Sequence, residues 1–177
     1  YAKLFSVADA FIGHDRAIRA RYDDSVVRVI EAGSAGEALQ FIRRARGYAP
    51  LPLAMPAKAR EGEDVSRETS VREQGCSIFA TGPEQKNTFA LTRDAEAFVS
   101  QHIGDLENAE TYDAWLQAKG RYETLFEIEP DRIACDLHPE YLTSKWAHDE
   151  SRARNLPLTE VQHHHAHIVS VMGEHGL

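Results

Sequence analysis

The pattern of apolar and polar positions divides this chain into two unequal parts. In the first part, the β-branched run Ser25–Ile30 predicts a strand, Gly33–Gly36 a turn, and Leu39–Tyr48 a second strand that ends in a basic loop. Apolar residues are otherwise sparse here, and roughly 56 residues rarely support a core of this kind. We therefore expect residues 1–56 to be the end of a domain rather than a self-sufficient one.

A proline-rich and then strongly charged stretch separates the two parts. Pro50, Pro52 and Pro56 come first, and charged residues with few apolar ones follow as far as Gln74. Prolines remove backbone donors, and a charged run of this composition cannot bury a core. The pattern predicts an interdomain crossing near 50–75, with the linker proper at 57–75.

The second part, residues 76–177, has a regular rhythm. Three short runs, Ser77–Gly82, Asn87–Arg93 and Glu96–Ile103, predict an antiparallel meander. Asn108–Phe126 then predicts an amphipathic helix, with Asp105 or Asn108 as its cap. Its apolar stripe consists of Tyr112, Trp115, Leu116, the stem of Lys119, Tyr122 and Phe126.

Strands and helices alternate after Pro130. Arg132–Leu137 and Leu158–Gln162 predict strands, whereas Thr143–Ala153 and His164–Glu174 predict helices, the first with Thr143 or Ser144 near its cap. The order β-β-β-α-β-α-β-α indicates an α/β layered fold whose strands are parallel after the meander.

Composition and charge narrow the function classes. The chain is 42% hydrophobic and 27% charged, which is typical of a folded globular domain. Its net charge of −8 argues against a nucleic-acid partner held by bulk charge. No run reaches the ~18 apolar residues of a membrane helix. Cys76 and Cys135 form no CxxC, so we expect two buried thiols in a reducing cytoplasm.

The stretch QHHHAHI, from Gln162 to Ile168, is the most specific local feature. His163 and His167 are spaced i, i+4, which puts both imidazoles on one helix face, as a shared divalent ion requires. His164 lies about 100° away around the helix. Spacing alone leaves open a polar helix start with chance histidines. Two ligands do not complete a zinc or iron shell, so any others must come from elsewhere.

Three other clusters leave two interpretations open. Lys86, Asn87 and Thr88 follow a glycine turn and suit a phosphate, or they form the polar tip of a hairpin without P-loop spacing. Asp136 and His138 follow a parallel strand, where ligands bind, although His138 before Pro139 also suits a turn. Arginines around Asp-Asp-Ser either grip an anion or form a salt-bridged strand edge; this cluster includes Arg16, Arg21, Asp24 and Ser25.

Together these stretches carry a family resemblance. HDRAIRARYDDSVVRV and RRARGYAPLPL resemble the end of the YrdC-like domain of the HypF-type hydrogenase maturation carbamoyltransferases. KNTFALTRD, SQHIGDLEN, CDLHPEYLTSKWA and VQHHHAHI resemble, in the same order, the start of their next domain. That domain is similar to the threonylcarbamoyltransferases of tRNA modification and has the actin-like ATPase (ASKHA, ribonuclease H-like) fold.

The resemblance implies a reaction and a set of roles. Such enzymes hydrolyse carbamoyl phosphate, adenylate the carbamate with ATP, and pass the carbamoyl group to the C-terminal cysteine of the partner HypE. The resulting thiocarboxamide becomes cyanide on the iron of [NiFe]-hydrogenase. By resemblance, His163 and His167 are the zinc or iron ligands, and Lys86, Asn87 and Thr88 lie near the nucleotide. Arg16, Arg21, Asp24 and Ser25 lie at the rim of the carbamoyl-adenylate chamber.

The sequence also departs from the family pattern. The acylphosphatase domain, the CxxC zinc fingers, most of the YrdC-like domain and the second half of the actin-like domain are absent. Together with the missing initiator Met, this predicts a segment of a longer protein that is inactive alone. A metal-dependent tRNA threonylcarbamoyl-transfer protein and a non-catalytic module that docks HypE remain as alternatives. The fused YrdC-like tail and the HHHAH form of the motif weigh against the first alternative.

Overall fold

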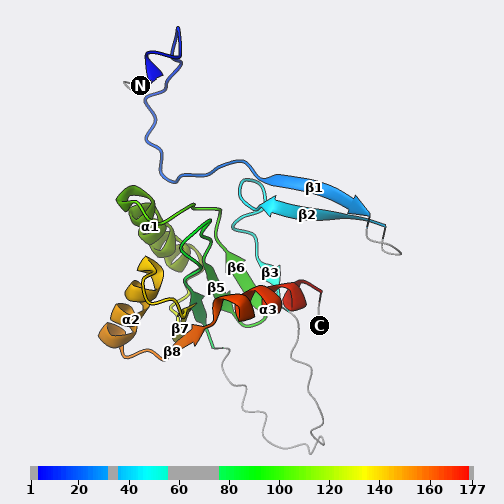
Figure 1. The fold of residues 1–177 in the computed structure, drawn as a ribbon, viewed down its shortest axis with the longest axis vertical. Helices are drawn as coiled ribbons and strands as arrows, with labels where there is room; N and C mark the ends of the chain where they lie inside the picture. The colour runs from blue at the N-terminus through cyan, green and yellow to red at the C-terminus, as the bar shows by residue number, and fades with distance from the viewer. Residues whose placement is uncertain (1–3, 32–35, 56–75, 176–177) are drawn as a thin grey trace, which may run out of the picture.

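The computed structural model describes residues 4–31, 36–55 and 76–175, in which two sheets and three helices form (Figure 1). A two-stranded hairpin comes first, made of β1 (Val26–Glu31) and β2 (Glu37–Arg43). The remaining strands are β3 (Leu53–Ala54), β4 (Ile78–Ala80), β5 (Ala90–Arg93), β6 (Glu96–Val99), β7 (Arg132–Asp136) and β8 (Leu158–Val161). The helices are α1 (Ala109–Phe126), α2 (Leu142–Arg154) and α3 (His163–His175).

The larger sheet has the order β3-β6-β5-β4-β7-β8. β3, β6, β5 and β4 pair antiparallel, whereas β4, β7 and β8 pair parallel. This confirms the predicted meander followed by parallel strands. The parallel half brings the carboxyl ends of β7 and β8 to one edge, with Asp136 opposite Val161. The elements that follow these strands therefore start side by side.

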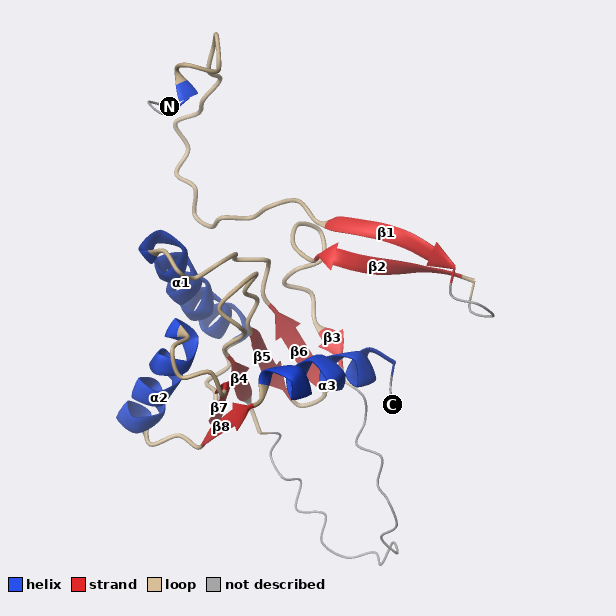
Figure 2. Ribbon diagram, in the orientation of Figure 1, coloured by secondary structure: helices blue, strands red, loops and turns tan. Residues whose placement is uncertain are grey.

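One face of the sheet carries the main core (Figure 2). Trp115 of α1 is fully buried, and its ring lies 5.9 Å from that of Phe79 in β4 and 5.1 Å from that of Trp146 in α2. Because both helices pack against the ring of Phe79, they cover the same face of the sheet. The cap of α1 is Asn108, whose side chain accepts a hydrogen bond from the backbone amide of Thr111 at 2.8 Å. Of the two predicted caps, Asp105 and Asn108, the structure has Asn108.

The first part agrees with the prediction at its second strand and departs from it at β3. The second strand ends at Arg43, and the predicted basic loop follows it as the backbone turns over Ala45–Leu51. Residues 53 and 54, expected in the interdomain crossing, form β3 and pair with β6 at the edge of the large sheet. The expected linker at 57–75 lies outside the described residues, and the domain division at 56 and 76 stays a prediction.

The guanidinium of Arg44 joins that turn to the large sheet. It donates to the carbonyl oxygens of Tyr48 at 2.8 Å, Leu51 at 2.7 Å and Val99 at 3.3 Å. The backbone carbonyl of Arg44 also accepts from the amide of His102 at 3.3 Å. One arginine therefore fixes the segment before β3 against the end of β6.

The last helix, α3, follows β8 directly and, in the view of Figure 1, runs from the end of β8 toward the side on which β3 lies. Every side chain from Gln162 to Gly173 is exposed, including the apolar ones of Ile168 and Met172. Among the described helices, none is both long enough and apolar enough to cross a membrane.

Candidate metal centre

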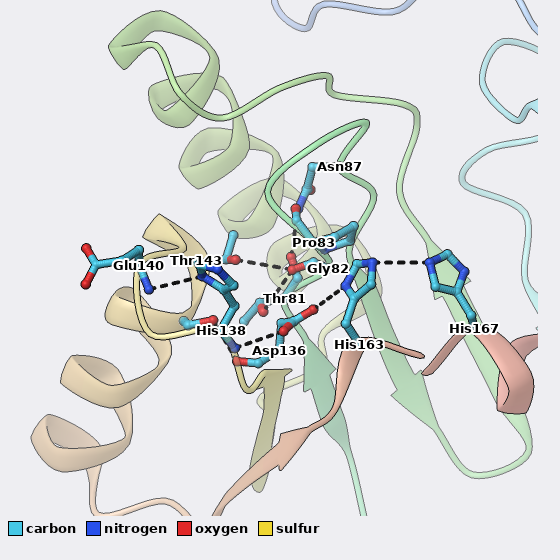
Figure 3. A network of polar contacts seen from close by, with 11 residues as sticks. Thr81, Gly82, Pro83, Asn87, Asp136, His138, Glu140, Thr143, His163 and His167 are labelled. Carbon is cyan, nitrogen blue, oxygen red and sulfur yellow. Dashed lines mark hydrogen bonds and ion pairs between the residues drawn. The ribbon is translucent and has the colours of Figure 1, made fainter. Parts of the chain in front are cut away.

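The candidate site lies where β7 and β8 end. Asp136 is the last residue of β7, and α3 starts at His163, two residues after the end of β8. Because β7 and β8 are adjacent and parallel, their carboxyl ends carry these two side chains to the same place. His163 lies between Asp136 and His167 in Figure 3.

The three side chains form a short polar chain. Oδ2 of Asp136 lies 2.6 Å from Nδ1 of His163, and Nε2 of His163 lies 3.2 Å from Nε2 of His167. The two imidazole rings are nearly perpendicular, at 78°, with centroids 4.8 Å apart. The predicted i, i+4 pair therefore does converge, and it converges through the Nε2 atoms.

This geometry fits a bound metal ion. The two Nε2 atoms are 3.2 Å apart, a separation that one ion could span, because zinc–imidazole bonds are about 2.0–2.1 Å long. The carboxylate of Asp136 holds Nδ1 of His163, as carboxylates do behind metal-bound histidines. Among the described residues, no group of three or more His, Cys, Asp or Glu side chains is arranged to hold a metal. Metal binding by His163 and His167 stays a prediction, and any further ligands would have to come from outside the described residues.

The loop between β4 and β5 lies beside this centre (Figure 3). Gly82 has φ of +75°, and a Cβ there would lie 2.0 Å from the carbonyl oxygen of Thr88. Asn87 is fully buried, and its Nδ2 donates to the carbonyls of Thr81 at 3.1 Å and Pro83 at 2.6 Å. The side-chain amide nitrogen of Asn87 was expected to face a nucleotide. It instead hydrogen-bonds two carbonyls of its own loop and so holds the loop in shape.

The other two predicted nucleotide residues are more available. The side chain of Lys86 is exposed, while its backbone, at φ of +50°, donates to Oδ1 of Asp105 at 2.7 Å. Thr88 is half-buried. Nucleotide binding by Lys86, Asn87 and Thr88 stays a prediction, with Lys86 the one that presents its charged group to solvent.

The first turn of α2 connects this loop to the metal centre. Oγ1 of Thr143 donates to the carbonyl of Gly82 at 3.2 Å, and Oγ of Ser144 donates to the carbonyl of Asp136 at 2.7 Å. Both side chains are buried. Both residues lie near the helix cap, as predicted, and the capping residue itself is Tyr141. The two hydroxyls join the ends of β4 and β7 to one turn of helix.

A buried carboxylate at this point was missed in the sequence. Glu84 is 8% exposed, and its Oε2 accepts from the backbone amide of Leu142 at the start of α2, at 2.9 Å. An acidic side chain is favourable at a helix N-terminus. Glu84 lies 58 residues before Leu142, so no local signal predicts the pairing.

His138 lies on the other side of Asp136 (Figure 3). Its backbone amide donates to Oδ1 of Asp136 at 2.9 Å, and its ring stacks on Tyr141 with centroids 4.2 Å apart. Nδ1 of His138 accepts from the amide of Glu140 at 3.3 Å. These contacts fit the expectation of a turn residue, and they place a second imidazole next to Asp136.

The predicted chamber-rim residues lie in the first part of the chain. Oγ of Ser25 donates to the carbonyl of Arg46 at 2.8 Å and accepts from the amide of Ala45 at 2.8 Å, so it holds the turn after β2. Asp24 pairs with Arg46 at 3.3 Å. Arg16 is exposed, and Arg21 lines a cavity of about 40 Å³ that Arg121 also lines. Their role at a chamber stays a prediction.

The cysteine expectation is half wrong. Cys135 in β7 is buried, and burial raises the pKa of its thiol to about 11. Cys76 is exposed, since it precedes the first strand of the meander instead of lying in it.

A comparison with protein families shows which family this chain belongs to. Residues 73–174 match the family model described as the HypF Kae1-like domain. The chain belongs to the HypF family. Its Kae1-like region has the α/β architecture that the element order indicated and the actin-like fold that the family resemblance implied. The matched region contains Asp136, His163 and His167, the β4–β5 loop and the first turn of α2.

Relatives align with nearly the whole of this chain. It is 43% identical over 174 residues to carbamoyltransferase HypF2 of Cupriavidus necator and 39% identical over 175 residues to carbamoyltransferase HypF of Synechocystis. These alignments cover 98% and 99% of this chain but 19% and 20% of the relatives. The chain therefore spans about a fifth of the length of the curated relatives that it matches.

Two solved structures have the same architecture. Full-length HypF in the phosphate- and nucleotide-bound form matches 98% of this chain and 24% of that chain, with 39% identity and a TM-score of 0.75. HypF of T. kodakarensis matches 89% of this chain and 18% of that chain, with 32% identity and a TM-score of 0.69.

Proposed function

We propose that this chain forms the first part of the carbamoyl-transfer domain of a HypF enzyme. The enzyme uses carbamoyl phosphate and ATP to carbamoylate the C-terminal cysteine of HypE in the cytoplasm, for cyanide synthesis in [NiFe]-hydrogenase maturation. Family membership and the names of the relatives support the carbamoyl chemistry. A metal-dependent step in this part of the chain is supported by one observation: the Nε2 atoms of His163 and His167 converge.

The transfer reaction defines what the site must do. The carbamate oxygen attacks the α-phosphorus of ATP and pyrophosphate leaves. The sulfur of the cysteine thiolate then attacks the carbamoyl carbon, and the bond to AMP breaks. His163 and His167 would hold zinc or iron, which supplies positive charge for the oxygens of the adenylate. Asp136 orients His163, and Lys86 on the adjoining loop offers a cation to phosphate.

The metal assignment is tested by comparing three histidines in the intact protein. We expect His163→Ala and His167→Ala each to lower the zinc or iron content by at least about tenfold, because each removes one of two converging ligands. His164→Ala is the matched control on the same helix turn, and it should leave the content unchanged. If His164→Ala strips the metal while the other two retain it, the ligand face is a different one. If none of the three changes it, the cluster is structural.

The activity is tested with the same variants. The intact protein should release pyrophosphate from ATP only with carbamoyl phosphate, and it should transfer labelled carbamoyl to a peptide with the HypE C-terminal cysteine. We expect the His163 and His167 variants to lose transfer to the peptide. Binding of HypE without any transfer by the wild type would instead support a docking module. Specific tRNA binding at physiological salt would favour the threonylcarbamoyl-transfer alternative.

A further inference from the structure

Asp136 is held more firmly than the histidine that it contacts. Its side chain is 9% exposed, against 50% for His163. Oδ1 of Asp136 accepts the amide of His138 at 2.9 Å, and its backbone carbonyl accepts the hydroxyl of Ser144 at 2.7 Å. The amide of His138 therefore orients the carboxylate, Ser144 holds the backbone that carries it, and Oδ2 contacts His163.

From this geometry we propose that Asp136 is the positioning residue of the metal centre and sets the tautomer of His163. A carboxylate accepts hydrogen bonds, so Nδ1 of His163 carries the proton that bridges the 2.6 Å contact. The Nε2 atom of the neutral ring then has a free lone pair, and it faces Nε2 of His167. The inference rests on the proposed metal function of this pair.

The two histidines are not equivalent in this arrangement. When both rings are neutral, a hydrogen bond across the 3.2 Å between their Nε2 atoms needs one of these atoms to be protonated. The contact with Asp136 places the proton of His163 on Nδ1, so Nε2 of His163 is the acceptor. His167 is therefore the donor, with its proton on Nε2. For Nε2 of His167 to accept a metal ion, the proton of that ring would have to sit on Nδ1. His163 is thus already in the tautomer that a metal would need, whereas His167 would have to change its tautomer.

The first test reads the tautomers of the metal-free intact protein by ¹⁵N NMR, with the His163 signals assigned by their loss in His163→Ala. Wild type should have His163 protonated on Nδ1 and His167 on Nε2. Asp136→Ala should shift His163 toward the Nε2-protonated form. Glu140→Ala is the matched control, because it removes an exposed carboxylate of the same loop that pairs with Lys145. Unchanged His163 tautomers in Asp136→Ala would overturn the proposal.

The second test measures zinc affinity by competition with a chromogenic chelator. We expect Asp136→Ala to bind zinc about 10- to 100-fold more weakly than wild type. Glu140→Ala should bind like wild type. Asp136→Asn keeps the shape and an acceptor oxygen, so it should recover part of the loss and, by circular dichroism, should fold even where the alanine variant does not. Equal affinity in all four proteins would overturn the positioning role.

The two readouts separate this inference from the proposed function. If wild type takes up no zinc or iron, the proposed metal function fails. The tautomer of His163 still decides whether Asp136 orients the ring. If wild type binds metal but Asp136→Ala changes neither readout, the metal function stands and the role of Asp136 is wrong.

Discussion

The α-carbon of Gly82 faces the carbonyl oxygen of Thr88 across the β4–β5 loop, so closely that an added Cβ would lie 2.0 Å from that oxygen. The contact is between backbone atoms, so no side chain can move to relieve it. Gly82 also has φ of +75°, which side chains of L-residues rarely allow. Two independent facts therefore favour glycine at position 82: a Cβ would clash with the backbone of Thr88, and the backbone has a positive φ.

We therefore expect Gly82→Ala to lower the free energy of unfolding by about 3 kcal/mol or more, from overpacking and left-handed strain together. Chemical denaturation measures this loss. Gly120→Ala is the control, because Gly120 lies in α1 with open space around its α-carbon. That change should stabilise the helix by about 0.5–1 kcal/mol. Equal effects of the two variants would contradict the role of the Gly82 contact.

Lys119 contributes to the core through its charge as well as its stem. Its Nζ lies 5.4 Å from the centre of the Phe79 ring and 5.2 Å from that of Trp146, and it binds Glu123 at 2.8 Å. We expect Lys119→Ala to cost about 2 kcal/mol of unfolding free energy. Lys145→Ala removes a more exposed ion pair with Glu140 and should change it by less than about 0.5 kcal/mol. A loss no larger for Lys119 than for Lys145 would show that the ring contacts add nothing.

Arg44 should control how firmly the segment before β3 is attached to the large sheet. Burial lowers the pKa of its guanidinium, but arginine stays charged and its three carbonyl contacts persist. We expect Arg44→Ala to speed amide hydrogen exchange over Tyr48–Ala54 and at His102. Arg43→Ala removes a looser, half-exposed pair with Asp23 and should leave these amides protected. Unchanged exchange in Arg44→Ala would contradict the clamp.

The two cysteines should differ sharply in alkylation. Burial is the main reason that the pKa of Cys135 rises to about 11, and the nearby Glu160 raises it further. We expect iodoacetamide at pH 8 to modify exposed Cys76 quickly and Cys135 only on unfolding, as peptide mass spectrometry would report. Equal rates for the two thiols in the folded protein would contradict this assignment.

The same pKa shift sets a pH dependence of stability. The unfolded thiol ionises near its ordinary pKa of 9.0, and the folded one only near 11, so the folded state holds its proton longer. This contribution is fully present below about pH 9 and is lost as the pH rises toward 11. Cys135→Ala should therefore flatten the fall of unfolding free energy over this range, measured by denaturation at several pH values. An unchanged slope would contradict the cause.

Features that depend on neighbours in the chain could be predicted from the residue pattern. The apolar periods gave the three-strand meander, the three helices and the parallel strands after Pro130. The i, i+4 spacing of His163 and His167 placed both rings on one helix face, since helix geometry fixes that relation locally. The quoted stretches also carried the resemblance to the family that the comparison then showed.

Contacts between groups far apart in the chain became known from the fold. Asp136 and His163 are 27 residues apart, and they meet because β7 and β8 pair in parallel and end at one edge. Glu84 contacts the start of α2, and the side-chain amide of Asn87 turns inward to the loop carbonyls. Both are buried polar groups, and such groups need hydrogen-bond partners, which the fold brings from distant parts of the chain. Sequence patterns report periodicity along the chain, whereas these contacts depend on strand order and register.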